Sequence, residues 1–286
     1  MIVPVYRQWE LAQILVRHLQ AQTAPAKIWE VLIVANDGSG DLPTLALGDN
    51  MRIIRCDTAG SYAARNIGVD QARGAFCLFT DADCLPPPGW ISAFQTRATG
   101  SAHPDRHLIA GPTRMVAPPA CAPVSARFWA CFDMVRGIPQ ERYVTEGFAA
   151  TANLMAPRAL FKAIGPFDET RFSGGDAQWC FRALHHGAKL ELAPEAWTGH
   201  PCRSTWADLS LKARRVAAAL VQTDQGRTLA LLRKMTPPLR AMLRFAKSPA
   251  PVRCRVAAML ILLPLWAVEL GEILSVTLLG KTPERR

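Results

Sequence analysis

The sequence predicts an α/β fold with a mostly parallel central sheet flanked by helices. Short apolar runs, typical of buried strands, alternate with segments of helical periodicity from residue 2 to residue 193. Polar turn-forming residues follow several of these runs directly. Strands that alternate with helices in this order form parallel sheets through right-handed crossovers, and 286 residues are enough to bury a sizeable core.

The N-terminal part of the chain is predicted to run strand, helix, strand, strand, helix. The expected strands cover residues 2–6, 29–35 and 52–55, and the expected helices cover residues 9–22 and 60–74. In the second helix we expect Ala63, Ala64, Ile67 and Ala72 to face the core. The opening residues are already strand-like and have no charged or apolar leader, so we expect no signal peptide and a natural start upstream.

A buried strand over residues 76–80 runs directly into two carboxylates, Asp81 and Asp83. Alternation places both side chains on one side of the strand, where they repel one another unless a divalent cation binds them. In open α/β sheets, ligands bind in the crevice outside the carboxyl ends of the strands. An isolated Asp-Xaa-Asp sequence is more often a pair of solvated acids in a turn, so the other motifs decide between these interpretations.

The remaining elements are less regular. We expect strands over 107–113, 147–155 and 190–193 and helices that begin at 160 and 177, while residues 91–145 give no clear pattern. Further polar residues follow expected strands at Asp37, Asp176 and His200. Taken singly, Asp37 is typical of a turn, Asp176 of a helix cap and His200 of a structural histidine. Their order along the chain and their shared position at strand ends favour a single site.

Six motifs, in order, resemble the family 2 glycosyltransferases, which have the GT-A fold. The nucleotide-sugar half of that family is similar to Val3–Tyr6, Ile33–Ser39, Ala64–Gly68 and Thr80–Asp83. The family's acceptor-side acidic motif is similar to Ser173–Asp176 followed by Trp179 and Arg182, and its late metal-ligand histidine is similar to His200–Arg203. The resemblance covers residues 2–205.

The resemblance implies a site for a nucleoside-diphosphate sugar, with a UDP-sugar favoured. Asp37 would accept a hydrogen bond from the base, while Pro4 and Tyr6 would supply backbone and stacking contacts around it. Arg65 would approach the base or the diphosphate, because a guanidinium suits an anionic donor. Asp81 would lie toward the ribose and the metal.

The resemblance also implies a divalent cation, Mn²⁺ or Mg²⁺. Asp83 would bind the ion directly, with His200 and Asp81 completing the site. An imidazole ligand favours Mn²⁺ slightly, since Mg²⁺ prefers harder oxygen ligands. The ion would bridge the two phosphates and stabilise charge on the leaving nucleoside diphosphate.

Asp176 is the expected catalytic base of an inverting transfer to an acceptor hydroxyl, and Gly175, Trp179 and Arg182 are expected on the acceptor side. The family usually has Glu-Asp where this chain has Gly175-Asp176, so one acid is missing. Asp176 matches the second, base-like position. Gln178 stands where a further acid is common, which leaves the acceptor contacts open.

The net charge of +10 is concentrated near the C-terminus. Residues 1–205 carry 19 Lys and Arg against 18 Asp and Glu, whereas residues 206–255 carry 11 against two. An apolar stretch over 256–268 follows, interrupted by Pro264, with Glu269 and Glu272 beyond it. A basic segment beside an apolar helix predicts an anionic membrane surface as partner, and the absence of a nucleic-acid motif argues against nucleic acid.

The expected organisation is a GT-A domain over 1–205, with a donor half over 1–90 and an acceptor half over 91–205, and a basic helical region over 206–286. We expect the apolar helix to lie in the membrane interface, with a tilted span or packing onto the soluble domain as alternatives. The expected location is the cytoplasmic face of the cell membrane, where the acceptor is a saccharide, plausibly lipid-linked. Eight cysteines without a CxxC pair favour buried thiols.

Two other functions are compatible with the pattern. A sugar-phosphate nucleotidyltransferase has a similar strand-and-acid layout, but it needs a glycine-rich basic loop after the first strand, and residues 7–10 offer none. A membrane-attached nucleotide-sugar-binding protein without turnover stays open because of the missing acid at position 175.

Overall fold

The computed structural model describes residues 1–38, 40–221, 228, 232 and 234–281. The chain divides into two compact units. The sheet unit consists of Met1–Arg114, Ile138–Thr170 and Gly175–His200. The helical unit consists of Met115–Gly137, Arg171–Gly174 and Pro201–Arg286. The chain therefore leaves the sheet unit and returns to it before residue 200, and the boundary expected at 205 remains a prediction.

Seven strands form the main sheet of the described chain, in the order β3-β2-β1-β4-β7-β5-β8. Their bounds are β1 Ile2–Val5, β2 Val31–Ala35, β3 Met51–Arg55, β4 Phe76–Thr80, β5 His107–Ala110, β7 Asn153–Pro157 and β8 Lys189–Leu192. Strand β7 runs antiparallel to β4 and β5, and the other pairs are parallel. The prediction of a mostly parallel sheet is confirmed.

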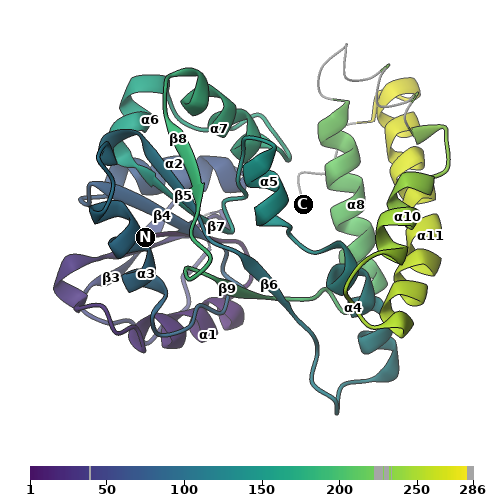
Figure 1. Cartoon of the computed structure of the whole chain (residues 1–286), viewed down its shortest axis with the longest axis horizontal. Coiled ribbons are helices and arrows are strands. Elements are labelled where there is room, and N and C mark those ends of the chain that lie inside the picture. Colours follow the sequence, from purple (N-terminus) through teal and green to yellow (C-terminus); the bar gives the residue numbers. More distant parts are fainter. Residues whose placement is uncertain (39, 222–227, 229–231, 233, 282–286) are drawn as a thin grey trace. The chain divides into compact units, whose positions relative to one another are not determined.

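Helices cover both faces of this sheet (Figure 1). One face packs against α1 (Trp9–Gln20) and α3 (Trp90–Thr99). The other packs against α2 (Ser61–Gln71), α6 (Arg158–Ile164) and α7 (Gly175–His185). Shorter helical elements are η1 (Ala26–Ile28), η2 (Pro104–Arg106) and α5 (Gln140–Thr145). Both faces of the strands are apolar because both are covered, as parallel sheets require.

Helix α2 differs from expectation at one position. Ala63, Ala64 and Ala72 are buried, but Ile67 is 36% exposed, so its predicted inward position is wrong. A Cβ atom on Gly68 would lie 2.5 Å from Cγ2 of Ile2 in β1. The helix thus packs on the sheet through the Gly68 side, which turns the neighbouring Ile67 outward.

The run expected as one strand over 107–113 is divided into β5 and β6 (Thr113–Val116), and β6 pairs with β9 (Thr198–Pro201) in a separate two-stranded sheet. The division follows from a close approach at Gly111, where a Cβ atom would lie 1.9 Å from the carbonyl oxygen of Ala196. The strand expected over 147–155 begins only at Asn153, because residues 150–153 form a turn closed by the Asn153 amide on the Ala150 carbonyl.

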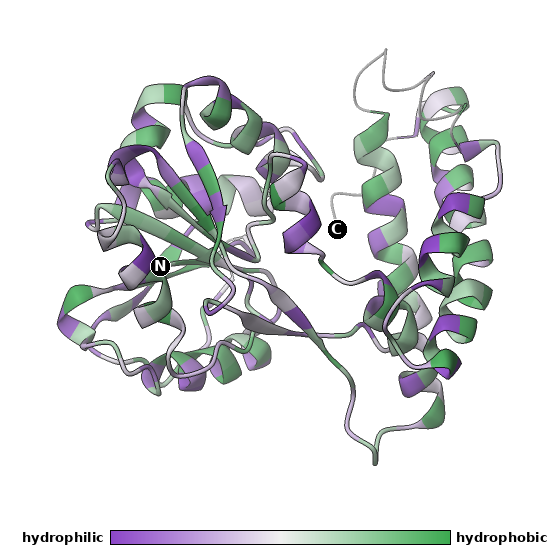
Figure 2. Cartoon of the chain, in the orientation of Figure 1, coloured by the Kyte–Doolittle hydropathy of each residue, from purple (hydrophilic) through white to green (hydrophobic). Residues whose placement is uncertain are grey.

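The helical unit contains α4 (Val124–Arg136), α8 (Trp206–Leu220), α10 (Leu239–Ala246) and α11 (Val252–Leu278). Figure 2 shows hydrophobic and hydrophilic residues alternating along these helices. Their core includes Phe132, Leu209, Phe245 and Ile261. Inside it, the Asp133 carboxylate accepts hydrogen bonds from the Arg203 backbone and guanidinium at 3.0 and 2.9 Å. Helix α4 was missed because it lies in the stretch that gave no clear pattern.

Candidate active site

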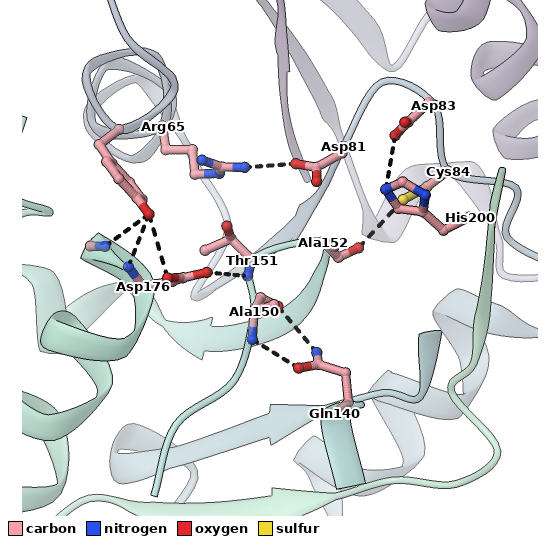
Figure 3. A network of polar contacts seen from close by, with 12 residues as sticks. Arg65, Asp81, Asp83, Cys84, Gln140, Ala150, Thr151, Ala152, Asp176 and His200 are labelled. Carbon is pink, nitrogen blue, oxygen red and sulfur yellow. Dashed lines mark hydrogen bonds and ion pairs between the residues drawn. The ribbon is translucent and has the colours of Figure 1, made fainter. Parts of the chain in front are cut away.

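The end of strand β4 carries the first polar pair of the site. The Arg65 guanidinium on α2 donates a hydrogen bond to Oδ1 of Asp81 at 2.7 Å (Figure 3). The Arg65 side chain is only 6% exposed, whereas Asp81 is 35% exposed. A buried guanidinium held by one carboxylate keeps its other donors in fixed directions, since the planar group carries five N–H bonds. Nε of Arg65 is buried without a hydrogen-bond partner.

A short antiparallel bridge brings Asp83 to His200. Leu85 and Gly199 exchange backbone hydrogen bonds of 2.9 and 3.1 Å, which connects the segment after β4 to strand β9. Nε2 of His200 consequently lies 3.6 Å from Oδ1 of Asp83 (Figure 3). His200 is buried, and Asp83 is partly exposed. Two residues that are far apart in the sequence therefore face one another at the end of β4.

Asp81, Asp83 and His200 form a group whose potential ligand atoms all lie within 4.8 Å of one another. Carboxylate oxygens with one imidazole suit Mn²⁺, and carboxylate oxygens alone suit Mg²⁺. One oxygen of Asp81 already accepts the Arg65 hydrogen bond, and Nε2 of His200 lies beside Oδ1 of Asp83. The residues present fit a divalent cation.

Asp37 is held by the loop that follows β1. Its Oδ1 accepts a hydrogen bond from the Arg7 amide at 2.7 Å, and its Oδ2 accepts one from the Trp9 indole at 2.5 Å. Arg7 has a φ of 57°, an uncommon value for a residue with a side chain, and its guanidinium lies 5.0 Å from the centre of the Tyr6 ring. Pro4 is buried within β1. Asp37 is therefore held against the segment that follows Tyr6, while Pro4 lies in the strand before it.

Asp176 lies in the first turn of α7, where its Oδ1 accepts a hydrogen bond from the Ala177 amide at 3.0 Å. Its Oδ2 accepts a hydrogen bond from the Thr151 amide at 3.3 Å (Figure 3). Burial raises the pKa of this carboxyl above its ordinary value, although the nearby Arg65 guanidinium and the two amides act in the opposite direction. A raised carboxyl pKa brings the group nearer to neutral pH, which suits a proton acceptor in catalysis.

The loop that supplies the Thr151 amide is fixed from two sides. The Gln140 side chain accepts the Ala150 amide at 2.8 Å and donates to the carbonyl oxygens of Ala150 and Asn153 at 3.1 Å (Figure 3). The Cys84 thiol lies 3.6 Å from the Ala152 carbonyl oxygen. Gln140 is fully buried, so this loop is a rigid support for Asp176.

Two expected acceptor-side residues have packing roles. Trp179 is 0% exposed, stacks on Phe161 with ring centres 4.2 Å apart, and donates to the Gly165 carbonyl at 3.0 Å. The ring is thus fully engaged in packing, and the expected acceptor contact of Trp179 stays a prediction. Arg182 donates to the carbonyl oxygens of Ile164 and Pro166 at 2.5 Å each. Both side chains hold the loop after α6, and Gly175, at the start of α7, is buried.

Sequence reasoning missed two residues of the site. Asn36 precedes Asp37 and ties the end of β2 to the next loop, with hydrogen bonds to Cys56, Thr58 and Gly60. Tyr62 reaches from α2 to the start of α7, where its hydroxyl lies 3.4 Å from Oδ1 of Asp176. Both residues lie inside motifs that were recognised for their neighbours, and only the fold shows which partner each one contacts.

Comparison with known proteins agrees with this arrangement. Residues 1–103 match the family model described as glycosyl transferase family 2. Glycosyltransferase AglE from Haloferax volcanii is 29% identical over 255 residues, which cover 87% of this chain and 81% of the relative. These two findings support a family 2 glycosyltransferase. A pre-mycofactocin glycosyltransferase from Mycobacterium tuberculosis is 27% identical over 158 residues, which cover 52% of this chain and 32% of that relative.

Solved glycosyltransferase structures share the fold. The mannosyltransferase PcManGT from Pyrobaculum calidifontis, in complex with GDP-Man and Mn²⁺, aligns over 99% of this chain and 75% of its own, with a TM-score of 0.52 and 17% identity. TarS 1–349 from S. aureus, in complex with UDP-GlcNAc, aligns over 99% of this chain and 92% of its own, with a TM-score of 0.51 and 15% identity. The chain is therefore a glycosyltransferase with the GT-A architecture.

Proposed function

We propose that this glycosyltransferase is inverting and metal-dependent, and that it transfers a sugar from a nucleoside-diphosphate sugar to a hydroxyl group of a lipid-linked saccharide. The observation that carries the proposal is the Asp81, Asp83 and His200 group at the carboxyl end of β4, where ligands of α/β sheets bind. Structural neighbours bound to UDP-GlcNAc, UDP and GDP-Man support a nucleotide-sugar donor, with UDP favoured as its nucleotide.

Asp83 and His200 would hold the cation, with Asp81 on its ribose side. A bound divalent ion supplies positive charge that stabilises the leaving diphosphate, and the neighbour solved with GDP-Man and Mn²⁺ supports such an ion. Arg65 is a fixed cation beside the same acids. Its buried, unpartnered Nε is compatible with a further contact to an anionic donor.

Asp176 is the proposed general base. It takes the proton from the acceptor hydroxyl while that oxygen attacks the anomeric carbon, and the bond to the leaving diphosphate breaks on the opposite face. One displacement of this kind inverts the configuration and needs no protein nucleophile. The fixed position of Asp176 against the Thr151 and Ala177 amides supports this role, because a base must be held within hydrogen-bond reach of its substrate.

The C-terminal helices support a membrane-bound acceptor. Helix α11 is long and apolar enough to cross a membrane by length and composition. Its apolar residues Val252, Val256, Leu260 and Leu263 are 42–64% exposed and recur at helical spacing. Exposed apolar stripes of this length are uncommon on soluble surfaces. In α10, Leu239 and Leu243 are also exposed, beside Arg240 and Arg244.

An in-plane orientation fits α11 better than a span. The opposite side of α11 packs on α4 and α8, and α8 carries Lys212, Arg214 and Arg215. A span would draw these charges toward hydrocarbon, at a cost of about 2.5–3.5 kcal/mol for each charge at the bilayer centre. Apolar residues flanked by arginines suit the surface of an anionic membrane. We assign the enzyme to the cytoplasmic face, because its proposed donor is a soluble nucleotide sugar.

Donor binding measured by calorimetry tests the proposal. UDP-, GDP- and dTDP-sugars are titrated into the full chain with EDTA, Mg²⁺ or Mn²⁺. We expect one nucleotide to bind only with metal, and Asp83→Ala to abolish that binding. Asp105→Ala is the matched control, since Asp105 is an exposed acid in η2, and it should bind as wild type does. Binding of no nucleotide sugar under any condition would refute the proposal, and binding without turnover would favour the non-catalytic alternative.

A further inference from the structure

The start of helix α7 is packed directly beneath an aromatic ring. A Cβ atom on Gly175 would lie 2.7 Å from Cε2 and Cζ of Tyr62 and 3.0 Å from its Cδ2. Tyr62 is buried, and its ring centre lies 5.7 Å from that of Phe167. The ring is therefore fixed by its own neighbours and cannot move aside at low cost. Any side chain at position 175, an acidic one included, is excluded by Tyr62.

The Tyr62 hydroxyl reaches three polar atoms at the same point. It accepts a hydrogen bond from the Gly175 amide at 2.8 Å and a longer one from the Asp176 amide at 3.4 Å. It also lies 3.4 Å from Oδ1 of Asp176. A phenol has one proton to donate and two lone pairs. The two amides use the lone pairs, so the proton is directed to the carboxylate.

We propose that Tyr62 is a positioning residue for Asp176, and that the absence of a side chain at Gly175 makes room for it. The inference rests on the proposed role of Asp176 as base. The hydroxyl holds the carboxylate at the oxygen that Thr151 does not bind, since the Thr151 amide binds Oδ2 and Tyr62 faces Oδ1. Gly175 is then required by the Tyr62 ring, which occupies the space of a Cβ atom.

The first test is Tyr62→Phe in the full chain, assayed for turnover and for metal-dependent donor binding. The ring stays, so folding and donor affinity should match wild type. We expect kcat to fall about tenfold through loss of a hydrogen bond to a charged group, with KM for the donor unchanged. Tyr143→Phe is the matched control, because it also removes a phenol hydroxyl and keeps the stack of this ring on Phe148. It should retain wild-type kcat.

The pH profile separates positioning from a purely structural role. Tyr62 donates to the charged form of Asp176, so its removal should raise the pKa of that carboxyl. The acid limb of the kcat profile then moves to higher pH in Tyr62→Phe. Arg65 and Asp81 also act on Asp176, and both remain in the variant. Wild-type kcat together with an unmoved acid limb would overturn the inference.

A second pair of variants tests the packing half of the inference. Gly175→Ala places a Cβ atom against the ring and should lower the melting temperature. In a Tyr62→Ala background, which is itself destabilised by the cavity left behind, the same Gly175→Ala change should lower it by less, because the ring is gone. Equal melting temperatures for Gly175→Ala and wild type would contradict the coupling. Asp176→Asn is the reference throughout: if it retains wild-type turnover, the proposed function itself fails, whatever Tyr62→Phe does.

Discussion

The two units of the chain use polar and apolar residues in opposite ways. In the sheet unit the polar groups of the site are buried or half-buried and are paired across elements, as Arg65 with Asp81 and His200 with Asp83. In the helical unit an apolar stripe on α11 is exposed, while Asp133 is 1% exposed in the interior. Departures from the usual pattern of apolar inside and polar outside mark the functional parts of each unit.

The proposed function assigns different roles to the two units. We infer that the sheet unit provides chemistry, which requires charges held in fixed positions, and that the helical unit provides a membrane-binding surface, which requires exposed apolar area near cations. Substitutions in the sheet unit should then change rate at constant membrane affinity. The outer stripe of the helical unit consists of the exposed α11 residues Val252, Val256, Leu260 and Leu263. Substitutions in this stripe should change membrane affinity at constant rate. The following predictions test that separation, from the largest expected effect to the smallest.

Asp176→Asn should have the largest effect. General-base catalysis contributes about 10²–10⁴-fold to rate, so we expect kcat to fall by that factor. Donor affinity and vesicle binding should stay as in wild type, because Asp176 contacts neither the predicted metal ligands nor the helical unit's outer stripe. Single-turnover assays with calorimetry of donor binding measure both quantities. An equal loss of donor affinity would show that Asp176 serves binding.

Asp133→Asn tests the interior of the helical unit. Burial alone would raise the pKa of Asp133, but the Lys212 and Arg203 cations together lower it below the ordinary value. Because the pKa of Asp133 is lower in the folded state, its ionised carboxylate stabilises the fold at pH values above the ordinary Asp pKa of about 3.9. This contribution is lost as the pH falls through the lower folded-state pKa. The variant should be about 2 kcal/mol less stable at pH 7, a modest loss for a buried pair because Arg203 is partly exposed.

Urea unfolding of wild type and Asp133→Asn at pH 7 and near pH 3 measures this difference. The difference in free energy of unfolding between the two proteins should be smaller at the acidic pH than at pH 7. Asp105→Asn, on an exposed surface, should change stability by less than about 0.5 kcal/mol at either pH. If this difference in free energy of unfolding is the same at both pH values, the stability lost in Asp133→Asn arises from packing and not from charge.

Leu260→Ser should have the smallest effect and one confined to the membrane. Removing an exposed leucine from the outer stripe should weaken binding to anionic vesicles about fivefold, since only part of its ~1.5–3 kcal/mol transfer free energy is realised at an interface. Folding and donor binding should not change. Leu211→Ser, an exposed leucine on α8, is the matched control. Equal vesicle binding by wild type and Leu260→Ser would show that this face of α11 does not contact the membrane surface.

The sequence predicted the parts of the fold that depend on local pattern. Strands β1 to β4 and helices α1 and α2 lie where alternation of apolar runs placed them, within a few residues. Helix α4 was missed, because its buried residues Ala130–Asp133 face a helical core whose partners come from far along the chain. The division of β5 from β6 was missed for a similar reason, since Gly111 meets Ala196 only in the folded state.

For the site, the residue types were predictable and their contacts were not. Asp81 and Asp83 could be paired from their spacing directly after the strand. His200 was found as a polar residue after an expected strand, and its role as a metal ligand came from the family resemblance. The meeting of Asp83 and His200 depends on the Leu85–Gly199 bridge, which no local signal encodes. Trp179 was expected on the acceptor side through the resemblance, and only the fold shows its full burial and its packing role. Tyr62 was overlooked because an aromatic residue in a helix usually belongs to the core.

The Leu85–Gly199 bridge also has a consequence for synthesis of the chain. The donor half emerges from the ribosome first, but the histidine that faces Asp83 and the carboxylate proposed as base are made more than ninety residues later. A nascent or truncated chain that ends before β9 contains Asp176 but lacks His200 and the bridge that positions it. Such a fragment cannot bring Asp83 and His200 together around an ion.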